Sequence, residues 1–287
     1  MTKFVGSRSM QVQDRAKNIS FPVLMMYPTQ VPSSPVAFGP YSIDVSPEAP
    51  IDGDSLPVVI ISHGGGGSHL LYRSLAAYLA KEGYLVAMPE HPGNNRNNNA
   101  LDGTIENVEN RPRHIQLVID AVCADAQFKD RVQSTNAAII GHSLGGYTAL
   151  AVAGGKPCAG LGQMVEVTPD DRVKSLVLMA PATNWYVLND SLKDVRTPIL
   201  LLSAEHDPIT PRWQAQLVLD LIPNRAQVTF KVIENAGHFS FLTPFPPAMM
   251  RPGFAPAIDP DGFDRQRFHV QLNEEILTFL NKTLRDS

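Results

Sequence analysis

Short apolar runs alternate with stretches of helical periodicity along most of the chain. Eight runs have the length and composition of strands, and the apolar spacing between several of them is typical of helices. The predicted strands are 10–14, 19–27, 57–62, 84–88, 137–140, 173–179, 199–203 and 228–233, and the predicted helices are 70–81, 108–125, 213–221, 268–284 and one directly after residue 146. The alternation predicts an α/β fold with a mostly parallel central sheet of about eight strands, flanked by helices on both faces.

The chain contains no internal repeat and no low-complexity linker, so we expect a single domain over residues 1–287. Three segments break the alternation and are expected to be irregular insertions, near 28–56, 154–172 and 241–263. The first is rich in Pro, Ser and Gly and is expected to form irregular surface chain. The third follows the predicted strand at 228–233 and is rich in Pro and Phe. We expect it to fold over a binding site.

A Gly-His-Ser-Leu-Gly-Gly string at 141–146 lies between the apolar run 137–140 and a helix-forming stretch. This strand–turn–helix context is that of a nucleophile elbow, in which a serine is held at the tip of a sharp, strained turn. Residues two positions away on either side must lack bulk, and Gly141 and Gly145 meet that need. The pattern predicts Ser143 as a catalytic nucleophile.

A serine hydroxyl needs a base, and the base needs an acid that orients it. Loops at the carboxyl ends of two later predicted strands supply candidates: Asp207 and Glu205 in the first, His238 in the second. The order Ser143, Asp207, His238 is that of an α/β-hydrolase catalytic triad. We favour Asp207 as the acid, and Glu205 remains its competitor.

An oxyanion hole requires two backbone amides aimed at the developing negative charge. Leu144 follows the nucleophile at a helix N-terminus and is the first expected donor. The loop after the strand at 57–62 is His63 followed by four glycines, and Gly65 is the expected second donor, with Gly66 as the alternative. A phosphate-binding P-loop is excluded, because no Gly-Lys-Ser/Thr follows.

With these motifs in place the chain resembles the α/β-hydrolase superfamily. More narrowly, it is similar to bacterial predicted dienelactone hydrolases and platelet-activating-factor-acetylhydrolase-like serine esterases. That similarity uses Asp14-Arg15, the segment 22–28, Phe38-Gly39-Pro40-Tyr41, the segment 62–68 and Glu90-His91-Pro92-Gly93. True dienelactone hydrolases have a cysteine nucleophile, whereas the elbow here holds Ser143. The resemblance therefore implies cofactor-free hydrolysis of carboxylic esters through an acyl-enzyme, without the dienelactone substrate.

Composition and charge narrow the function classes. The net charge of −4 and the lack of a basic run argue against nucleic-acid binding. Cys123 and Cys158 give no zinc spacing, and no His-x-x-x-His pair is present, so we expect no metal and no cofactor. No segment approaches 18 apolar residues and Met1–Met10 has no apolar core, so we expect a soluble, cytoplasmic protein without stable membrane insertion.

Several further residues could line a substrate pocket. We expect contributions from Gly66, His91, Trp185, Tyr186 and Phe239. Two other histidines are expected to be structural: His63 would brace the glycine loop, and His142 would pack within the elbow.

These predictions together describe a serine hydrolase that acts on a small-molecule ester with a hydrophobic or short-to-medium acyl group. An amidase, peptidase or acyltransferase could use the same triad, because all of them share the acyl-enzyme. A catalytically silent binding protein on this fold is disfavoured, because every expected group is present.

Overall fold

The computed structural model describes residues 3–159 and 162–286. Its centre is a ten-stranded sheet with the order β10-β9-β8-β7-β5-β6-β2-β1-β4-β3. The strands are β1 (Phe4–Asp14), β2 (Ile19–Thr29), β3 (Ser34–Phe38), β4 (Tyr41–Pro47), β5 (Leu56–Ser62), β6 (Leu85–Pro89), β7 (Val132–His142), β8 (Val173–Met179), β9 (Ile199–Ala204) and β10 (Val228–Ile233). The prediction of an α/β fold with a mostly parallel sheet is confirmed, and the strand number is ten instead of about eight.

The strands from β5 to β10 form the parallel part of the sheet. The strand β5 has β6 on one side and β7 on the other, so the strand order reverses there. In open α/β sheets, ligands bind in the crevice at the carboxyl ends of the strands beside such a reversal. The loops that follow β5 and β7 are the glycine loop and the Ser143 turn, which places both at this crevice.

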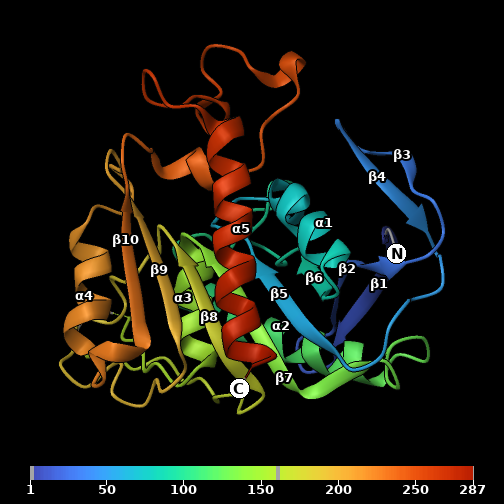
Figure 1. The fold of residues 1–287 in the computed structure, drawn as a ribbon. Helices are drawn as coiled ribbons and strands as arrows, with labels where there is room; N and C mark the ends of the chain where they lie inside the picture. The colour runs from blue at the N-terminus through green and yellow to red at the C-terminus, as the bar shows by residue number, and fades with distance from the viewer. Residues whose placement is uncertain (1–2, 160–161, 287) are drawn as a thin grey trace.

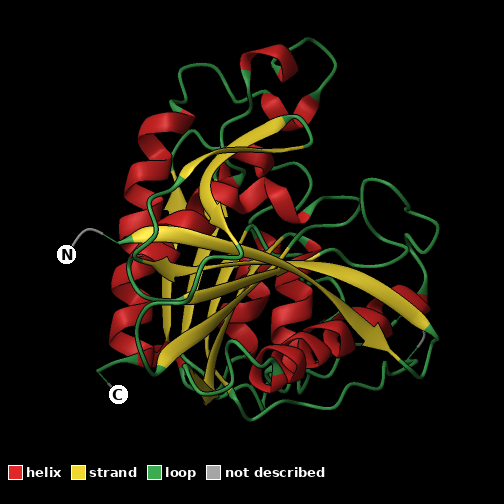
Figure 2. Ribbon diagram, turned by 90° about the vertical axis from the view of Figure 1, so that its right-hand side faces the viewer, coloured by secondary structure: helices red, strands yellow, loops and turns green. Residues whose placement is uncertain are grey.

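Helices cover both faces of the sheet (Figure 1), and the view turned by 90° shows the strands between two helical layers (Figure 2). The α-helices are α1 (Arg73–Lys81), α2 (Ile105–Ala124), α3 (Leu144–Val152), α4 (Trp213–Leu221) and α5 (Arg265–Leu284). Short 3₁₀ turns are η1 (His69–Tyr72), η2 (Arg225–Gln227), η3 (His238–Phe241), η4 (Pro247–Met249) and η5 (Ala255–Ala257).

The two long helices begin at side-chain caps. The Thr104 hydroxyl accepts a hydrogen bond from the Asn107 amide at the start of α2. The Asp264 carboxylate does the same for the Arg267 amide at the start of α5. Such caps satisfy one of the backbone donors that a helix start leaves without an intrahelical partner.

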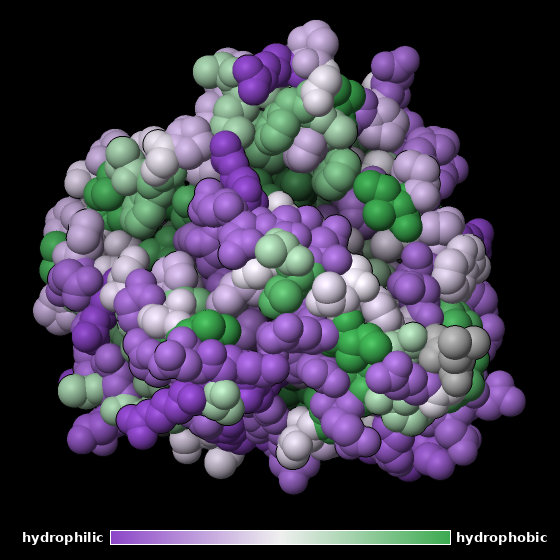
Figure 3. Space-filling view, turned by 180° about the vertical axis from the view of Figure 1, so that it is seen from behind, coloured by the Kyte–Doolittle hydropathy of each residue, from purple (hydrophilic) through white to green (hydrophobic). Residues whose placement is uncertain are grey.

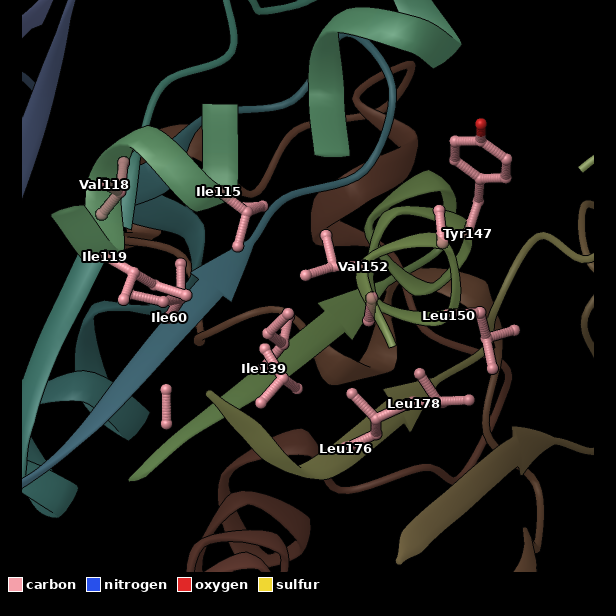
Figure 4. Close-up of a cluster of buried hydrophobic side chains, with 14 of the residues drawn as sticks. Ile60, Ile115, Val118, Ile119, Ile139, Tyr147, Leu150, Val152, Leu176 and Leu178 are labelled. Atoms are coloured by element: carbon pink, nitrogen blue, oxygen red, sulfur yellow. The ribbon is translucent and has the colours of Figure 1, made fainter. Parts of the chain in front are cut away.

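The hydrophobic core has two layers, one on each face of the sheet. Helices α2, α3 and α4 pack on one face, while α1 and α5 pack on the other. Figure 4 shows part of the first layer: Ile60 of β5 lies beside Ile115 and Ile119 of α2, and Ile139 of β7 lies near Val152 of α3. These packed layers fix the ends of β5 and β7 relative to each other, because well-packed interiors are rigid.

The segment 28–56 was expected to be irregular, and this prediction is wrong for much of its length. It contains a hairpin of β3 and β4, and β4 adds to the sheet beside β1. Gly39, with a φ of 56°, lies in the tight turn between them. The strand β4 buries Tyr41, Ile43 and Val45 on alternate positions, which is the period of a half-exposed strand. Its proline and serine residues obscured that period in the sequence.

The segment 241–263 contains the short turns η4 and η5 and otherwise no regular secondary structure. It forms the uppermost part of the molecule in Figure 1, beyond the carboxyl ends of the parallel strands. Among the described residues, no helix combines the length and the apolar character needed to cross a bilayer.

Candidate active site

A cavity of about 310 Å³ opens at the carboxyl ends of the parallel strands. Its walls come from the glycine loop, the Ser143 turn, η3, β4 and the segment 241–263. The lining residues are Tyr41, Gly64, Gly65, Gly66, Gly67, Ser68, Leu71, Tyr72, Arg96, His142, Ser143, His238, Phe239, Leu242, Phe254 and Pro256. In the space-filling view, apolar surface gathers around a hollow at the upper end of the molecule, where Figure 1 draws the segment 241–263 (Figure 3).

Ser143 lies in a strained turn between β7 and α3. Its φ of 54° and ψ of −121° belong to a region that side-chain-bearing residues rarely adopt. A methyl group at Gly141 would collide with the Gly145 carbonyl, and one at Gly145 would collide with the Ser62 carbonyl. Both glycines therefore allow the strand and helix to close around the serine, as the sequence predicted.

Asp207 and His238 meet at this site although 31 residues separate them. The His238 Nδ1 lies 2.8 Å from the Asp207 Oδ2, and both side chains are buried. The Asp207 carboxylate also accepts hydrogen bonds of 2.8 Å from the amides of Ile209 and Thr210. Because Asp207 has these partners, its orientation toward His238 is fixed.

Glu205 lies apart from this pair. Its Oε2 accepts a hydrogen bond of 2.7 Å from the Asn235 amide on the exposed side of the loop. The structure therefore pairs the histidine with Asp207, the acid that the sequence analysis favoured.

The carboxyl of Asp207 is held in its charged form. Burial alone would raise its pKa, but the hydrogen bond and charge of His238, together with bonds from Thr210, outweigh burial and lower the pKa to about 2. Asp207 is thus an ionised partner for the imidazole Nδ1, which leaves Nε2 as the nitrogen that can accept a proton.

Ser143 and His238 line the same cavity. Within the described parts of the chain, the Ser143 hydroxyl makes no hydrogen bond, so its link to His238 remains a prediction. In enzymes without substrate, this contact is often longer than in the working complex.

The two predicted oxyanion donors lie side by side. Leu144 is the first residue of α3, and the first amides of a helix have no intrahelical acceptor. A methyl group at Gly65 would lie 3.6 Å from the Leu144 Cδ2, which shows how closely the loop approaches the helix start. The Gly65 amide donates to no acceptor in residues 3–159 and 162–286. Neither amide has an acceptor in this part of the chain, and their role as oxyanion donors stays a prediction.

His142 joins the elbow to its neighbours. Its Nδ1 lies 2.9 Å from the Tyr72 hydroxyl, and its Nε2 lies 2.9 Å from the His238 carbonyl oxygen. Burial is the main cause that lowers the pKa of His142 to about 3, and the nearby His238 adds to it. The His142 imidazole therefore stays neutral, and its Nε2 donates to the His238 carbonyl oxygen. It supports the backbone of the histidine loop, in agreement with its predicted structural role.

Three of the expected pocket residues lie elsewhere, and those predictions need correction. His91 is fully buried, where its Nε2 contacts the Ser62 hydroxyl at 2.9 Å and its Nδ1 contacts His114. Tyr186 is fully buried and donates to the Tyr147 carbonyl, while Trp185 packs against the core below α3. None of the three lines the cavity: His91 follows β6 and is held by Ser62 and His114, while Trp185 and Tyr186 follow β8 and contact Tyr147 of α3. Gly66 and Phe239 do line it.

Other cavity residues escaped the sequence analysis. Tyr41 and Phe254 come from segments expected to be irregular, and Arg96 comes from an asparagine-rich loop. The Phe-rich composition of 241–263 was the one available signal for Phe254. Among the described residues, no group of three or more His, Cys, Asp or Glu side chains could hold a metal ion.

Comparisons with known proteins agree with the fold described above. The family model described as the alpha/beta hydrolase fold matches residues 57–197, which include the glycine loop and the Ser143 turn. A solved ferulic acid esterase from Streptomyces cinnamoneus superposes with a TM-score of 0.76 at 18% identity, covering 99% of this chain and 91% of that one.

Relatives of known activity are distant. Cutinase est1 of Thermobifida alba is 23% identical over 194 residues, which are 67% of this chain and 56% of that protein. A bis(hydroxyethyl) terephthalate hydrolase of Streptomyces coelicolor is 26% identical over 138 residues, or 48% of this chain and 39% of that protein. The chain thus spans little more than half the length of the first relative. From its sheet order, its strained serine turn and these matches, we conclude that this chain has the α/β-hydrolase fold.

Proposed function

We propose that the protein is a serine hydrolase that cleaves carboxylic esters through an acyl-enzyme. The observation that supports this most directly is the strained Ser143 turn in one cavity with His238, whose Nδ1 is bonded to an ionised Asp207. A hydroxyl, a base and a fixed acid are the three parts that activate a serine.

The reaction follows from this geometry. His238 Nε2 takes the proton from Ser143 Oγ as that oxygen attacks the ester carbonyl. The amides of Gly65 and Leu144 hold the negative charge that develops on the carbonyl oxygen. His238 then gives its proton to the departing alcohol, and water releases the acid by the same steps in reverse order. Asp207 fixes the imidazole tautomer and stabilises the imidazolium.

The comparisons support an ester substrate. The relatives are named as cutinases, as a bis(hydroxyethyl) terephthalate hydrolase and, for the solved structure, as a ferulic acid esterase. All of these names describe hydrolysis of carboxylic esters. The apolar side chains of Leu71, Phe239, Leu242 and Phe254 in the cavity wall suit an ester with a hydrophobic part.

The narrower resemblance, to predicted dienelactone hydrolases and platelet-activating-factor-acetylhydrolase-like esterases, is part of this proposal. It rests on Asp14-Arg15 and the segments 22–28, 38–41, 62–68 and 90–93. Since the nucleophile is Ser143, we assign the branch without the dienelactone substrate.

The decisive test is the Ser143→Ala variant, assayed with p-nitrophenyl esters from acetate to palmitate. We expect turnover to fall to the rate of the uncatalysed reaction, because the acyl-enzyme can no longer form. Ser134→Ala is the matched control: this exposed serine lies near the start of β7, the strand that leads into the Ser143 turn, and the variant should keep full activity. Normal turnover by Ser143→Ala would refute the proposal.

Two further measurements separate the alternatives. Product analysis with competing amines and alcohols distinguishes hydrolysis from acyl transfer, which the triad alone does not. A fluorophosphonate probe that failed to label the folded protein at Ser143 would indicate a binding protein that lacks catalysis.

A further inference from the structure

Arg111 on α2 is a fully buried guanidinium beneath the glycine loop. None of the ion pairs formed by the described residues includes it. Burial lowers its pKa to about 9, an effect that the nearby hydroxyls of Tyr72 and Tyr147 oppose only in part. A charge that is buried without a carboxylate partner is rare, because removing it from water costs free energy. The hydrogen bonds of the Arg111 guanidinium therefore indicate what the buried charge does.

The first arm of the guanidinium holds the glycine loop. Its Nη2 donates to the carbonyl oxygen of His63, two residues before Gly65, and contacts the Ser62 hydroxyl at 3.4 Å. Its Nη1 donates to the Asn94 Oδ1 at 2.7 Å. Asn94 in turn lies 3.8 Å from where a methyl group on Gly65 would be. Arg111 thus holds the loop that contains Gly65, the second predicted oxyanion donor.

The second arm reaches the helix that contains the other donor. The Arg111 Nε donates to the Thr148 Oγ1 at 3.1 Å, and that hydroxyl donates to the Leu144 carbonyl at 3.0 Å. Thr148 is itself fully buried. One rigid, planar group therefore connects the loop of Gly65 with the first residue of α3.

We propose that Arg111 is the positioning residue of the oxyanion hole, which sets the distance between the Gly65 and Leu144 amides and adds positive charge behind them. This inference rests on the proposed ester hydrolysis, in which those two amides hold the developing oxyanion. The guanidinium suits the task because its donors form a fixed fork, whereas a lysine ammonium is a single point charge. It touches no substrate atom itself.

The test compares the steady-state kinetics of four variants with those of the wild type. In Arg111→Lys the charge remains but the fork is lost, and we expect kcat to fall by about 10- to 100-fold with KM nearly unchanged. In Arg111→Met both are lost, and the fall should approach the roughly 100- to 1,000-fold of a missing oxyanion donor. Thr148→Val removes only the hydrogen bonds that link Arg111 to the Leu144 carbonyl, and it should lower kcat by about tenfold. Thr148→Ser keeps the hydroxyl and should retain most of the wild-type kcat.

The matched control is Arg113→Met. Arg113 lies on the same helix, two residues along, and pairs with Asp14 away from the cavity. Its substitution should lower the thermal stability and leave kcat as it is. A variant series in which kcat follows the melting temperature alone, with Arg113→Met as slow as Arg111→Lys, would overturn the proposal.

A second measurement does not depend on activity. In ¹⁵N-labelled protein, the amide resonances of Gly65 and Leu144 should shift in Arg111→Lys and Thr148→Val and stay in place in Arg113→Met. If the wild type hydrolysed no ester, the proposed function would be refuted. The amide shifts would still test whether Arg111 positions Gly65 and Leu144. Unmoved resonances in both variants would refute that role.

Discussion

At the scale of single residues, the site depends on side chains held in one orientation by their neighbours. Asp207 is the clearest example, because two backbone amides and a threonine hydroxyl leave its Oδ2 aimed at His238. The sequence favoured Asp207 as the acid but left Glu205 as a competitor, because both residues lie in one loop. Their partners separate them: Glu205 bonds to the Asn235 amide at the surface.

This difference predicts how two carboxamide variants behave. Asp207→Asn should lower kcat by about 10⁴-fold, because an amide at that place favours the wrong imidazole tautomer. Glu205→Gln should retain the wild-type kcat, because Glu205 contacts the surface of the loop and not the histidine. Steady-state kinetics with a p-nitrophenyl ester measure both, and a large loss in Glu205→Gln alone would reverse the assignment.

At the scale of elements, the junction between β7 and α3 decides whether the site forms. The strand and helix approach so closely at Gly145 that any side chain there would meet the backbone of β5 at Ser62. Backbone cannot move aside as a flexible side chain can, so the turn tolerates only glycine.

Two glycine variants test this junction. Gly145→Ala should destabilise the protein by about 3 kcal/mol, as overpacking of a tight interior does. Gly103→Ala is the control: its φ is 70°, but a methyl group there would meet nothing within 4 Å. It should cost only the conformational strain of about 1 kcal/mol. The midpoints of urea unfolding compare the two, and equal losses would show that crowding at the junction is unimportant.

At the scale of the whole molecule, buried neutral histidines make stability depend on pH. Burial lowers the pKa of His114 and of His142 to about 3, and those of His69 and His269 to about 4. The unfolded chain binds protons at these sites below a pH of about 6.5, whereas the folded chain does not. By linkage, stability is complete above that pH and falls as the pH drops toward the folded pKa values.

We therefore expect the free energy of unfolding to decrease by about 1.4 kcal/mol per pH unit for each such histidine between about pH 6 and 4. His114→Phe removes one of these groups and keeps the ring contact with Phe21. It should lower the slope by that amount, whereas the control Ser134→Ala, at an exposed position without a titratable side chain, should leave it unchanged. Urea unfolding at several pH values measures the slopes, and an unchanged slope in His114→Phe would contradict the prediction.

Local patterns in the sequence determined the chemistry and the fold class of this protein. Strand and helix periodicity predicted the parallel sheet, and the glycines around Ser143 predicted its turn, because those signals depend on residues close together in the chain. The hairpin of β3 and β4 gave a weak local signal, since its pairing with β1 joins distant segments.

Tertiary structure decided what the order of the triad motifs left open, namely which other distant side chains reach the site. His91, Trp185 and Tyr186 each follow a strand, as pocket residues do, yet His91 and Tyr186 are fully buried and the half-buried Trp185 packs against Tyr147 of α3. Arg111 lies within an ordinary helical pattern, and only the folded chain brings it under the glycine loop. The local sequence determines the backbone conformation and chemistry of a turn such as that of Ser143. The packing of helices on the sheet determines which turns line the same cavity.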